Sequence, residues 1–281
     1  MSAFVFPADP LNPRRVEEYF APQATLARDL GAATVVIDHD ALLAGRLNDA
    51  VRRVPEGIGA LCYRGWMIPS PAYAQLESAL APLDAHLVTG PEDYRRAHEF
   101  PGWYSAFAAV TPPGEWIPVP DDLPAALQAL SLGGRAIVKD FVKSRKHEWD
   151  EACFIPSVAD TEATARVVRR FLELQGTDLQ GGLVFRGFEE FVGPQARVWW
   201  VDGKPVLVTP HPDTPDDVVQ PEIEHITGPV RDLGCRFVTT DLARRSDGVW
   251  RVVEVGDGQV SDFPAGGDTT TLFSALHSLL D

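Results

Sequence analysis

The sequence predicts a protein of mixed α/β and α+β class in two parts, an amino-terminal domain (residues 1–110) and a larger region (residues 111–281). Helix and strand patterns alternate in the first part, as is typical of βαβ units. The segment Thr111–Pro124 then holds five prolines, which favours a connector between domains. Asp-Gly turn signals between apolar runs follow in the second part, and they indicate antiparallel hairpins.

In the amino-terminal domain, most expected elements begin or end at a recognisable residue. Pro22 is placed to open a helix that Gly31 closes, and Ser70 is placed to cap another helix. The β-branched run Ala33–Ile37 and the apolar run Gly59–Tyr63 are the expected strands. This alternation predicts a small domain of βαβ type.

The second part has a different order of elements. Val167, Phe171 and Leu174 recur at helical spacing, and Gly176 follows where a helix cap belongs, so Thr161–Leu174 should be a helix. The other expected elements are a strand at Arg135–Val142, a polar loop at Lys143–Asp150, a strand at Gly182–Phe191, a hairpin over Ala196–Val208 that turns at Asp202-Gly203, and a last helix from about Thr270 to Leu280.

The stretch Phe237–Asp262 reads as a hairpin that turns at Asp247-Gly248. Pairing counted outward from a two-residue turn places Asp241 directly opposite Glu254. Facing residues have Cβ atoms roughly 4.5–5.5 Å apart, and like charges there are destabilising unless something bridges them. Asp257 follows just past the strand end, so these three carboxylates are expected to converge on an oxygen-ligand site for Mg²⁺.

The alternative is that Asp241 and Glu254 pair with nearby arginines, namely Arg244, Arg245 or Arg251. Strand alternation places Arg251 on the opposite face from Glu254, which weakens this alternative.

Composition narrows the class of protein. The net charge of −15 argues against a sequence-independent nucleic-acid binder, since such proteins need surplus Lys and Arg. Three widely spaced cysteines fit neither a disulfide framework nor a zinc site. No signal peptide and no run of 18 apolar residues is present, so we expect a cytoplasmic protein without membrane partners. The oligomeric state stays open.

Lys139 stands inside the apolar run Ala136–Val142, where a lysine must reach water or meet an anion. A phosphate group is one such anion. The basic stretch that follows, which includes Lys143 and Ser144, is suited to fold over a triphosphate, and a solvated turn is its equally weighted alternative.

Two arginines and a strand end are further candidates. Arg186 and Arg197 each lie between apolar residues, where the alternative is an exposed strand face. Another strand ends in Glu189, Glu190, Phe191 and Val192, whose backbone is suited to contact an adenine edge while an acidic side chain binds a ribose hydroxyl.

Four motifs taken in order resemble the ATP-grasp fold, in which an amino-terminal βαβ-type domain is followed by two α+β lobes that enclose the nucleotide. They are IVKDFVKS (Ile137 to Ser144), LVFRGFEEF (Leu183 to Phe191), ARVWWVDGKPV (Ala196 to Val206) and TTDLARRSDGVWRVVEVGDGQ (Thr239 to Gln259). More narrowly, the chain is similar to the divergent clade marked by two arginines and a lysine. The eukaryotic cell-division-cycle assembly factor for a translation initiation factor belongs to the same clade.

The resemblance implies roles for individual residues. It makes Lys139 a contact of ATP phosphate, Arg186 and Arg197 the two arginines of the clade, and Asp241 and Glu254 ligands of Mg²⁺. Glu189 and Phe191 are then expected at the nucleotide hinge.

Two positions depart from the family pattern. Gln195 stands where members commonly have an acid, and Gly256 stands where ATP-grasp enzymes usually carry a metal-binding asparagine. Asp257 is expected to substitute for that asparagine.

The activity that the resemblance implies is ATP-dependent ligation of a carboxylate to an amine through an acyl phosphate. Arg197 is the candidate for holding the acyl phosphate oxygens, and Arg64 is the candidate for the substrate carboxylate. Two alternatives stay open, a non-enzymatic ATP-binding assembly protein or chaperone, and a phosphotransferase that acts on a small molecule.

Overall fold

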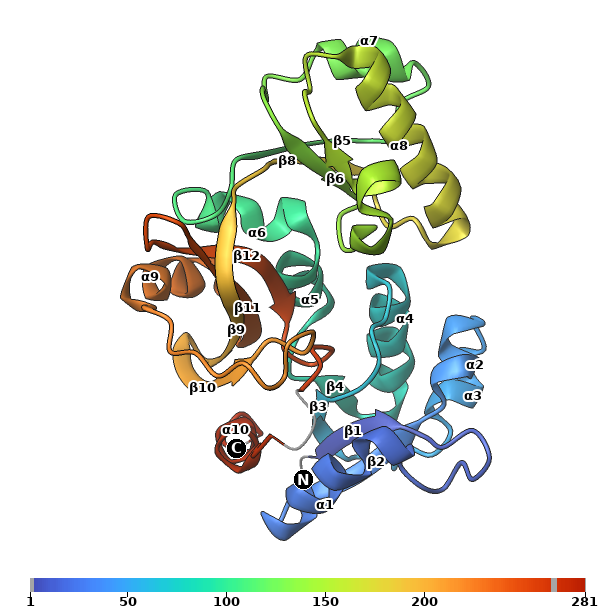
Figure 1. Ribbon diagram of the computed structural model, residues 1–281. Helices are drawn as coiled ribbons and strands as arrows, with labels where there is room; N and C mark the ends of the chain where they lie inside the picture. The colour runs from blue at the N-terminus through green and yellow to red at the C-terminus, as the bar shows by residue number, and fades with distance from the viewer. Residues whose placement is uncertain (1–2, 264–266, 281) are drawn as a thin grey trace.

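The computed structural model of the protein describes residues 3–263 and 267–280. Its elements form three groups, each built on a four-stranded sheet (Figure 1). We call these sheets the amino-terminal sheet (β2-β1-β3-β4), the lobe sheet (β5-β8-β6-β7) and the central sheet (β10-β9-β11-β12).

The amino-terminal sheet is entirely parallel. Its strands are β1 (Ala3–Pro7), β2 (Ala33–Ile37), β3 (Gly59–Tyr63) and β4 (Ala85–Leu87). The helices of this part are α1 (Ala21–Asp29), α2 (His39–Leu43), α3 (Leu47–Val51), α4 (Ser70–Leu80), α5 (Pro91–His98) and α6 (Phe100–Phe107), with 3₁₀ turns at Glu18–Phe20 and Ala81–Leu83. The predicted strands at β2 and β3 are confirmed with their expected bounds, and so is the helix that Pro22 opens. Ser70 is the first helical residue rather than the cap, because Pro69 occupies the cap position.

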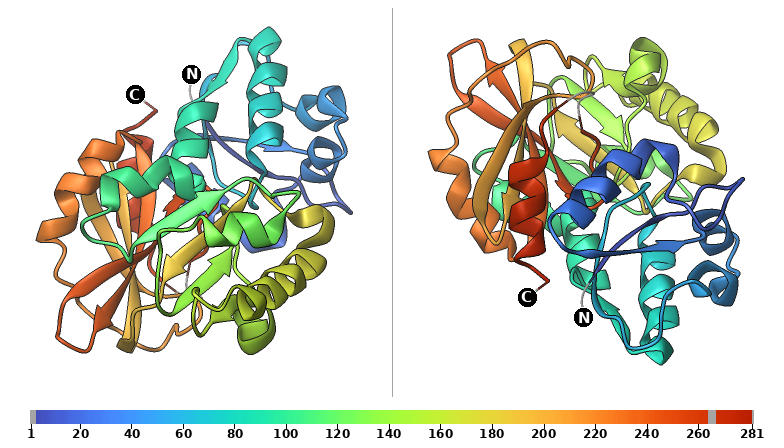
Figure 2. Two further views of the ribbon diagram at one scale, coloured as in Figure 1. Left: turned by 90° about the horizontal axis from the view of Figure 1, so that it is seen from above. Right: turned by 90° about the horizontal axis from the view of Figure 1, so that it is seen from below.

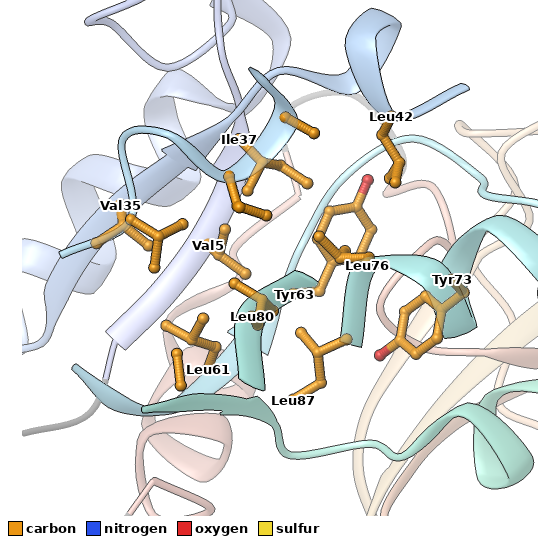
Figure 3. Packing of buried hydrophobic residues seen from close by; sticks show 14 of the residues in the cluster. Val5, Val35, Ile37, Leu42, Leu61, Tyr63, Tyr73, Leu76, Leu80 and Leu87 are labelled. Carbon is orange, nitrogen blue, oxygen red and sulfur yellow. The ribbon is translucent and has the colours of Figure 1, made fainter. Parts of the chain in front are cut away.

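Strand β1 was not among the predicted elements. All five of its residues are buried. Ala3 and Val5 belong to one core, in which Figure 3 labels Val5, and Phe4 and Phe6 belong to another. A strand covered on both faces lacks the alternation of apolar and polar residues that identifies a half-buried strand. The short apolar run therefore gave no periodic signal.

The lobe sheet carries the segment that was expected to be a connector. Its strands are β5 (Gly114–Ile117), β6 (Ala136–Lys139), β7 (Phe154–Ile155) and β8 (Leu183–Gly187). Its helices are α7 (Leu123–Gln128) and α8 (Thr161–Gln175), with short helical turns at Lys146–Glu148, Trp149–Cys153 and Gly176–Asp178. The connector prediction was wrong for Gly114–Ile117, which pairs antiparallel with β8. Helix α8 is confirmed, and the Asp160 side chain caps it by accepting from the Ala163 N–H at 2.9 Å.

Strand β6 ends at Lys139, earlier than predicted, for a local reason. The next residue, Asp140, is fully buried, and its carboxylate accepts hydrogen bonds from the N–H groups of Val142 (2.7 Å) and Lys143 (2.5 Å). These bonds turn the chain back toward the strand, where Ser144 forms an isolated bridge with Lys139. The predicted polar loop at Lys143–Asp150 is therefore partly helical.

The central sheet is antiparallel throughout. Its strands are β9 (Phe191–Val201), β10 (Lys204–Pro210), β11 (Phe237–Arg245) and β12 (Trp250–Asp257), and its helices are α9 (Glu224–Leu233) and α10 (Thr270–His277). The β9–β10 hairpin is confirmed. Both of its turn residues, Asp202 and Gly203, have positive φ, as the favoured two-residue hairpin turn requires.

In the β11–β12 hairpin Asp241 lies opposite Glu254, as predicted. The turn and the pairing between the turn and these residues differ from the prediction. The turn has three residues, since the Arg245 N–H bonds to the Val249 carbonyl at 2.9 Å and Gly248 has φ +92°. This shifts the pairing by one residue, and a β-bulge at Val253 shifts it back.

Hydrophobic cores of the protein contain residues from both sides of residue 110. The aromatic residues Phe100, Trp103 and Phe107 of α6 share a core with the central sheet. Leu272 and Phe273 of α10 share a core with β1 and α1, and Figure 2 shows α10 and α1 side by side. Helix α10, near the carboxyl end of the chain, therefore packs against strand β1 near its amino end.

The three cysteines, Cys62, Cys153 and Cys235, form no disulfide, as the sequence predicts, and all three are buried. Across residues 3–263 and 267–280, no helix combines the length and apolar character needed to cross a membrane.

Candidate functional site

A cleft of about 500 Å³ lies between the lobe sheet and the central sheet, and we call it the central cleft. Its lining includes one apolar group and one polar group. The apolar group comprises Met67, Pro112, Ile137, Val142, Trp149, Cys153, Phe188, Phe191 and Val253. The polar group includes Lys143, Ser144, Lys146, Arg186, Glu189, Gln195, His211, Asp213, Asp241 and Glu254. The sequence-predicted candidates Lys143, Ser144, Arg186, Glu189, Phe191, Asp241 and Glu254 therefore share one cleft.

A smaller pocket of about 220 Å³ adjoins the central cleft, and we call it the acidic pocket. The residues that line both are Met67, Val142, Lys146, His211, Asp213, Asp241 and Glu254. The acidic pocket adds Arg197, Asp257 and Asp262, together with the hydroxyls of Thr239 and Ser261. Five carboxylates line it, so a ligand with positive charge or a cation suits this end of the cleft.

Lys139 and Glu254 form an ion pair between the two sheets. Lys139 Nζ, on β6, lies 3.8 Å from Glu254 Oε1, on β12. The lysine side chain is only 7% exposed, whereas the glutamate side chain is 49% exposed. The expectation that a lysine inside an apolar strand meets an anion is therefore confirmed, and the anion in this structure is Glu254.

Arg197 binds Asp241 through two parallel hydrogen bonds, Nε to Oδ1 at 2.7 Å and Nη2 to Oδ2 at 2.8 Å. His211 Nε2 also lies 3.3 Å from Asp241 Oδ2. Burial by itself would raise the pKa of Asp241, but Arg197 and His211 outweigh it and hold that pKa below the usual range. Asp241 is thus an anion at neutral pH, and its partner is Arg197 rather than Arg244, Arg245 or Arg251.

The bulge at Val253 also affects the argument about Arg251. Across the bulge, Arg251 and Glu254 face Ala243 and Asp241, which are two residues apart on β11. Strict alternation therefore does not separate Arg251 from Glu254, and that part of the sequence argument was wrong. Arg251 instead binds Glu189, with two hydrogen bonds of 3.0 Å.

Asp257 is fully buried beside the acidic pocket. Its Oδ1 accepts from the backbone N–H and the side-chain amide of Gln259, each at 2.9 Å, while its Oδ2 has no hydrogen-bond partner among the described residues. Burial raises the pKa of Asp257 to about 7. In the described part of the chain, no three His, Cys, Asp or Glu side chains are grouped as around a metal ion, so the expected convergence of Asp241, Glu254 and Asp257 is not present.

The raised pKa of Asp257 predicts a pH-dependent stability. The group has a pKa of about 7 when folded and about 3.9 when unfolded, so its contribution to stability is fully present below pH 4 and is lost as pH rises toward 7. We expect Asp257→Asn to gain stability relative to the wild type between pH 4 and pH 8, by on the order of 3 kcal/mol. Urea unfolding at several pH values measures this difference.

The matched control is Asp29→Asn, at an exposed aspartate that ends α1. Because Asp29 is exposed, this substitution should change the free energy of unfolding by less than about 0.5 kcal/mol. A difference for Asp257→Asn that does not change with pH would contradict the raised pKa.

Gly256 stands where the family usually has a metal-binding asparagine, and the structure gives a steric reason for the glycine. A Cβ atom at this position would lie 3.2 Å from Thr239 Oγ1 and 3.4 Å from Ser261 Oγ. These two hydroxyls bond to each other at 2.7 Å. Polar oxygens of Thr239 and Ser261 therefore already fill the space that a longer side chain would need.

Arg186 lies on β8 and is buried, with its guanidinium group against β12. Its guanidinium carbon lies 5.6 Å from the Phe100 ring centroid and 5.7 Å from that of Trp103, and it donates to Thr111 Oγ1 at 2.7 Å. It also donates to the carbonyl of Val253, the residue that the bulge leaves outside the regular ladder. Burial lowers the pKa of Arg186 to about 10, so the side chain stays charged at neutral pH. Its Nε is buried and has no hydrogen-bond partner among the described residues.

Arg64 does not line the central cleft or the acidic pocket, and its predicted role with a substrate carboxylate has no support from its position. The side chain is 1% exposed and donates through Nη1 to three carbonyls, those of Gly258 (2.9 Å), Gln259 (2.8 Å) and Ser261 (3.0 Å). Its Nε donates to Gln23 Oε1 at 3.0 Å. Arg64 thus joins β3 to the segment that follows β12.

The remaining predicted nucleotide residues divide into two groups. Glu189 and Phe191 line the central cleft, and Glu189 is held there by Arg251. Glu190 and Val192 do not line it, because Glu190 points away to Arg135 at 3.0 Å and Val192 is 42% exposed.

The sequence did not identify His211 or the apolar wall. His211 is a single histidine in an acidic loop and carries no motif, and Ile137, Trp149 and Phe188 come from three separate segments. Only the fold brings them together. Lys146 belongs to the basic stretch that was expected to lie over a triphosphate, and it pairs with Asp213 at the cleft.

The whole chain has the fold of solved ATP-grasp structures. D-cycloserine synthetase DcsG is 17% identical over 100% of this chain and 99% of its own, with a TM-score of 0.66. A RimK domain protein ATP-grasp from Sphaerobacter thermophilus is 12% identical over 100% of this chain and 99% of its own, with a TM-score of 0.63. The ATP-grasp ligase PsnB, complexed with minimal precursor, Mg and ADP, is 13% identical over 99% and 98% of the two chains, with a TM-score of 0.58.

The family is more specific than the fold. The family model that matches describes an ATP-grasp domain, family 3 of the clade named for two arginines and a lysine, and it covers residues 129–276, more than half of the chain. The chain therefore belongs to that family, which confirms the resemblance to this clade. No curated protein matches the sequence significantly.

Proposed function

We propose that the protein is an ATP- and Mg²⁺-dependent ligase that joins a carboxylate to an amine through an acyl phosphate. The observation that carries this proposal is the ion pair of Lys139 and Glu254, which joins β6 to β12 at 3.8 Å and whose glutamate lines the central cleft. A buried cation suits a phosphate group, and a half-exposed carboxylate beside it suits the metal ion that accompanies phosphate. Membership of the ATP-grasp family supports the same assignment.

The apolar part of the central cleft suits the adenine of ATP, and its basic part suits the phosphates. The apolar wall formed by Ile137, Trp149 and Phe188 is suited to the adenine ring, and the backbone at Glu189 and Phe191 to its edge. Lys143 and Lys146 lie on the turn after β6, from which their side chains can reach the phosphates.

The carboxylates fit a magnesium ion in part. Glu254 is half exposed, and Asp257 has one oxygen without a partner among the described residues, whereas both oxygens of Asp241 accept from Arg197. Mg²⁺ commonly takes one or two carboxylates and completes its coordination with phosphate oxygens and water. Because the three carboxylates are not grouped around one position in the described residues, the half-exposed Glu254 is the residue that would hold the ion, with phosphate oxygens and water as its other ligands. The bound ion would neutralise charge on the phosphates.

In the proposed reaction, a substrate carboxylate oxygen attacks the γ-phosphorus as the bond to ADP breaks. The amine then attacks the acyl carbon, phosphate leaves, and the amine loses a proton to give the amide. Lys139 balances charge on the transferring group. Arg197, whose Nε and Nη2 bind Asp241, contributes its remaining N–H groups to the phosphate oxygens.

The test is ADP release in the presence of ATP, Mg²⁺ and the protein amino acids, singly and in pairs. Structural relatives include a D-cycloserine synthetase and a ligase complexed with a precursor, so short peptides belong in the panel. Hydroxylamine in place of the amine should trap the acyl phosphate as a hydroxamate. ATP binding without turnover on any pair would favour the assembly protein, and a phosphorylated product without amide or hydroxamate would favour the phosphotransferase.

A further inference from the structure

A second large hollow lies on the amino-terminal domain, apart from the central cleft. It has a volume of about 880 Å³ and shares no lining residue with the central cleft or the acidic pocket. It follows strand β2 along Thr34, Val35 and Val36, and we call it the β2 groove.

Strand β2 is an edge of the amino-terminal sheet. It pairs with β1 on one side, and in the described residues no strand pairs with its other side. An open edge offers unpaired N–H and carbonyl groups to an added strand. Charged residues on an edge strand often prevent pairing with another strand. At β2, however, the hollow leaves the edge of the strand accessible from solvent.

The charge of the β2 groove is opposite to that of the protein. Four arginines line it, Arg14, Arg15, Arg28 and Arg53, against two acids, in a chain of net charge −15. In the described part of the chain, none of the four forms a salt bridge. Arg28 donates only to the hydroxyls of Thr34 and Thr25, and Arg53 is half buried. Unpaired guanidinium groups gathered in one hollow favour an anionic ligand.

The rest of the lining distinguishes a peptide from a small anion. Val16, Val36 and Pro55 contribute apolar surface, whereas the Val35 side chain is buried in the core, so the groove offers both charged and apolar contacts along one strand. An extended peptide sends alternate side chains to opposite sides and satisfies an open edge with its backbone. Phosphate or polyphosphate would use the arginines but neither the apolar surface nor the edge.

We propose that the β2 groove binds an acidic segment of a partner protein in extended conformation, as a strand added to β2. The acidic side chains contact the four arginines, and alternate apolar side chains contact the valines. The length of β2 suits a segment of about five or six residues, at roughly 3.3 Å per residue. The site is independent of the proposed ligase reaction, because it shares no residue with the central cleft.

The test uses a fluorescein-labelled peptide of three Glu-Val repeats, blocked at both ends, with binding to the full chain followed by fluorescence anisotropy. We expect saturable binding that weakens with salt, and binding at least tenfold weaker for a peptide of three Lys-Val repeats. The variant Arg14→Glu, Arg15→Glu, Arg28→Glu should also bind the acidic peptide at least tenfold more weakly.

The matched control is Arg169→Glu, Lys204→Glu, Arg231→Glu, which makes the same change in net charge at exposed positions outside the groove. Retained binding by this control, with an unchanged thermal midpoint of both variants, supports the proposal. Equal loss in both variants would show a general charge effect and overturn it.

Two further probes test the added strand itself. Two Glu-Val peptides, each methylated on one of the two alternating sets of backbone amides, separate the amides that face β2 from those that face away. One of the two peptides should bind at least tenfold more weakly than the unmethylated peptide. If neither methylation pattern weakens binding, or if inorganic tripolyphosphate binds the groove and the peptide does not, the assignment of a peptide strand is wrong. Absence of any peptide binding by the wild type also overturns it.

Discussion

Glu254→Gln and Lys139→Met should each lower substrate-dependent ADP release by about 10²–10³-fold. Glutamine keeps the shape of Glu254 but removes the charge that suits a metal ion, and methionine keeps the length of Lys139 but removes the cation. Both groups belong to one ion pair between β6 and β12, at 3.8 Å. Because their effects are coupled, the double variant should lose little more than either single variant.

The controls for this experiment carry the same chemical changes elsewhere. Glu56→Gln and Lys204→Met alter exposed residues that line neither the central cleft nor the acidic pocket. Both should keep full activity and unfold at the wild-type temperature. Turnover that survives Glu254→Gln and Lys139→Met would exclude the proposed mechanism.

Arg64→Met should lower the free energy of unfolding by about 3–5 kcal/mol. The substitution leaves the carbonyls of Gly258, Gln259 and Ser261 without the donor that Arg64 Nη1 supplies, in a part of the protein closed to water. Methionine is also shorter and fills less of the space. Urea unfolding should show a lower midpoint with an unchanged slope.

The control variant Arg52→Met and a KM measurement distinguish a structural role of Arg64 from a role in substrate binding. Arg52 is exposed at the end of α3, so its replacement should change stability by less than about 0.5 kcal/mol. At a temperature where Arg64→Met is folded, its KM for the carboxylate substrate should match that of the wild type. A raised KM with unchanged stability would instead support the substrate role that the sequence suggested for Arg64.

Elements with a local signal could be predicted from the sequence. Helix α8 has a helical apolar period and a capping aspartate, and the β9–β10 hairpin has a two-residue Asp-Gly turn. Strand β1 has neither, because it is buried on both faces. The connector prediction failed at β5 because prolines on both sides of Gly114–Ile117 allow a short edge strand between them.

The candidate site divides in the same way. The charged residues on strands, Lys139, Arg197 and Asp241, were recognisable because a charge within an apolar strand needs a partner. Their partners were not recognisable, since the Arg197–Asp241 contact joins residues 44 positions apart. His211 had no motif to identify it.

In the β11–β12 hairpin, local sequence signals determine some features and tertiary packing determines the others. The sequence alone determined that this stretch turns back on itself, because turn residues act over a few neighbouring positions. The predicted pairing of Asp241 with Glu254 occurs, but only because the bulge at Val253 offsets the extra turn residue, and no sequence signal gave that bulge. Only the tertiary structure decided that Asp241 binds Arg197, that Glu254 meets Lys139 and that Asp257 is buried with Gln259. Those contacts depend on which sheets pack together, and packing brings together residues that local sequence signals do not relate.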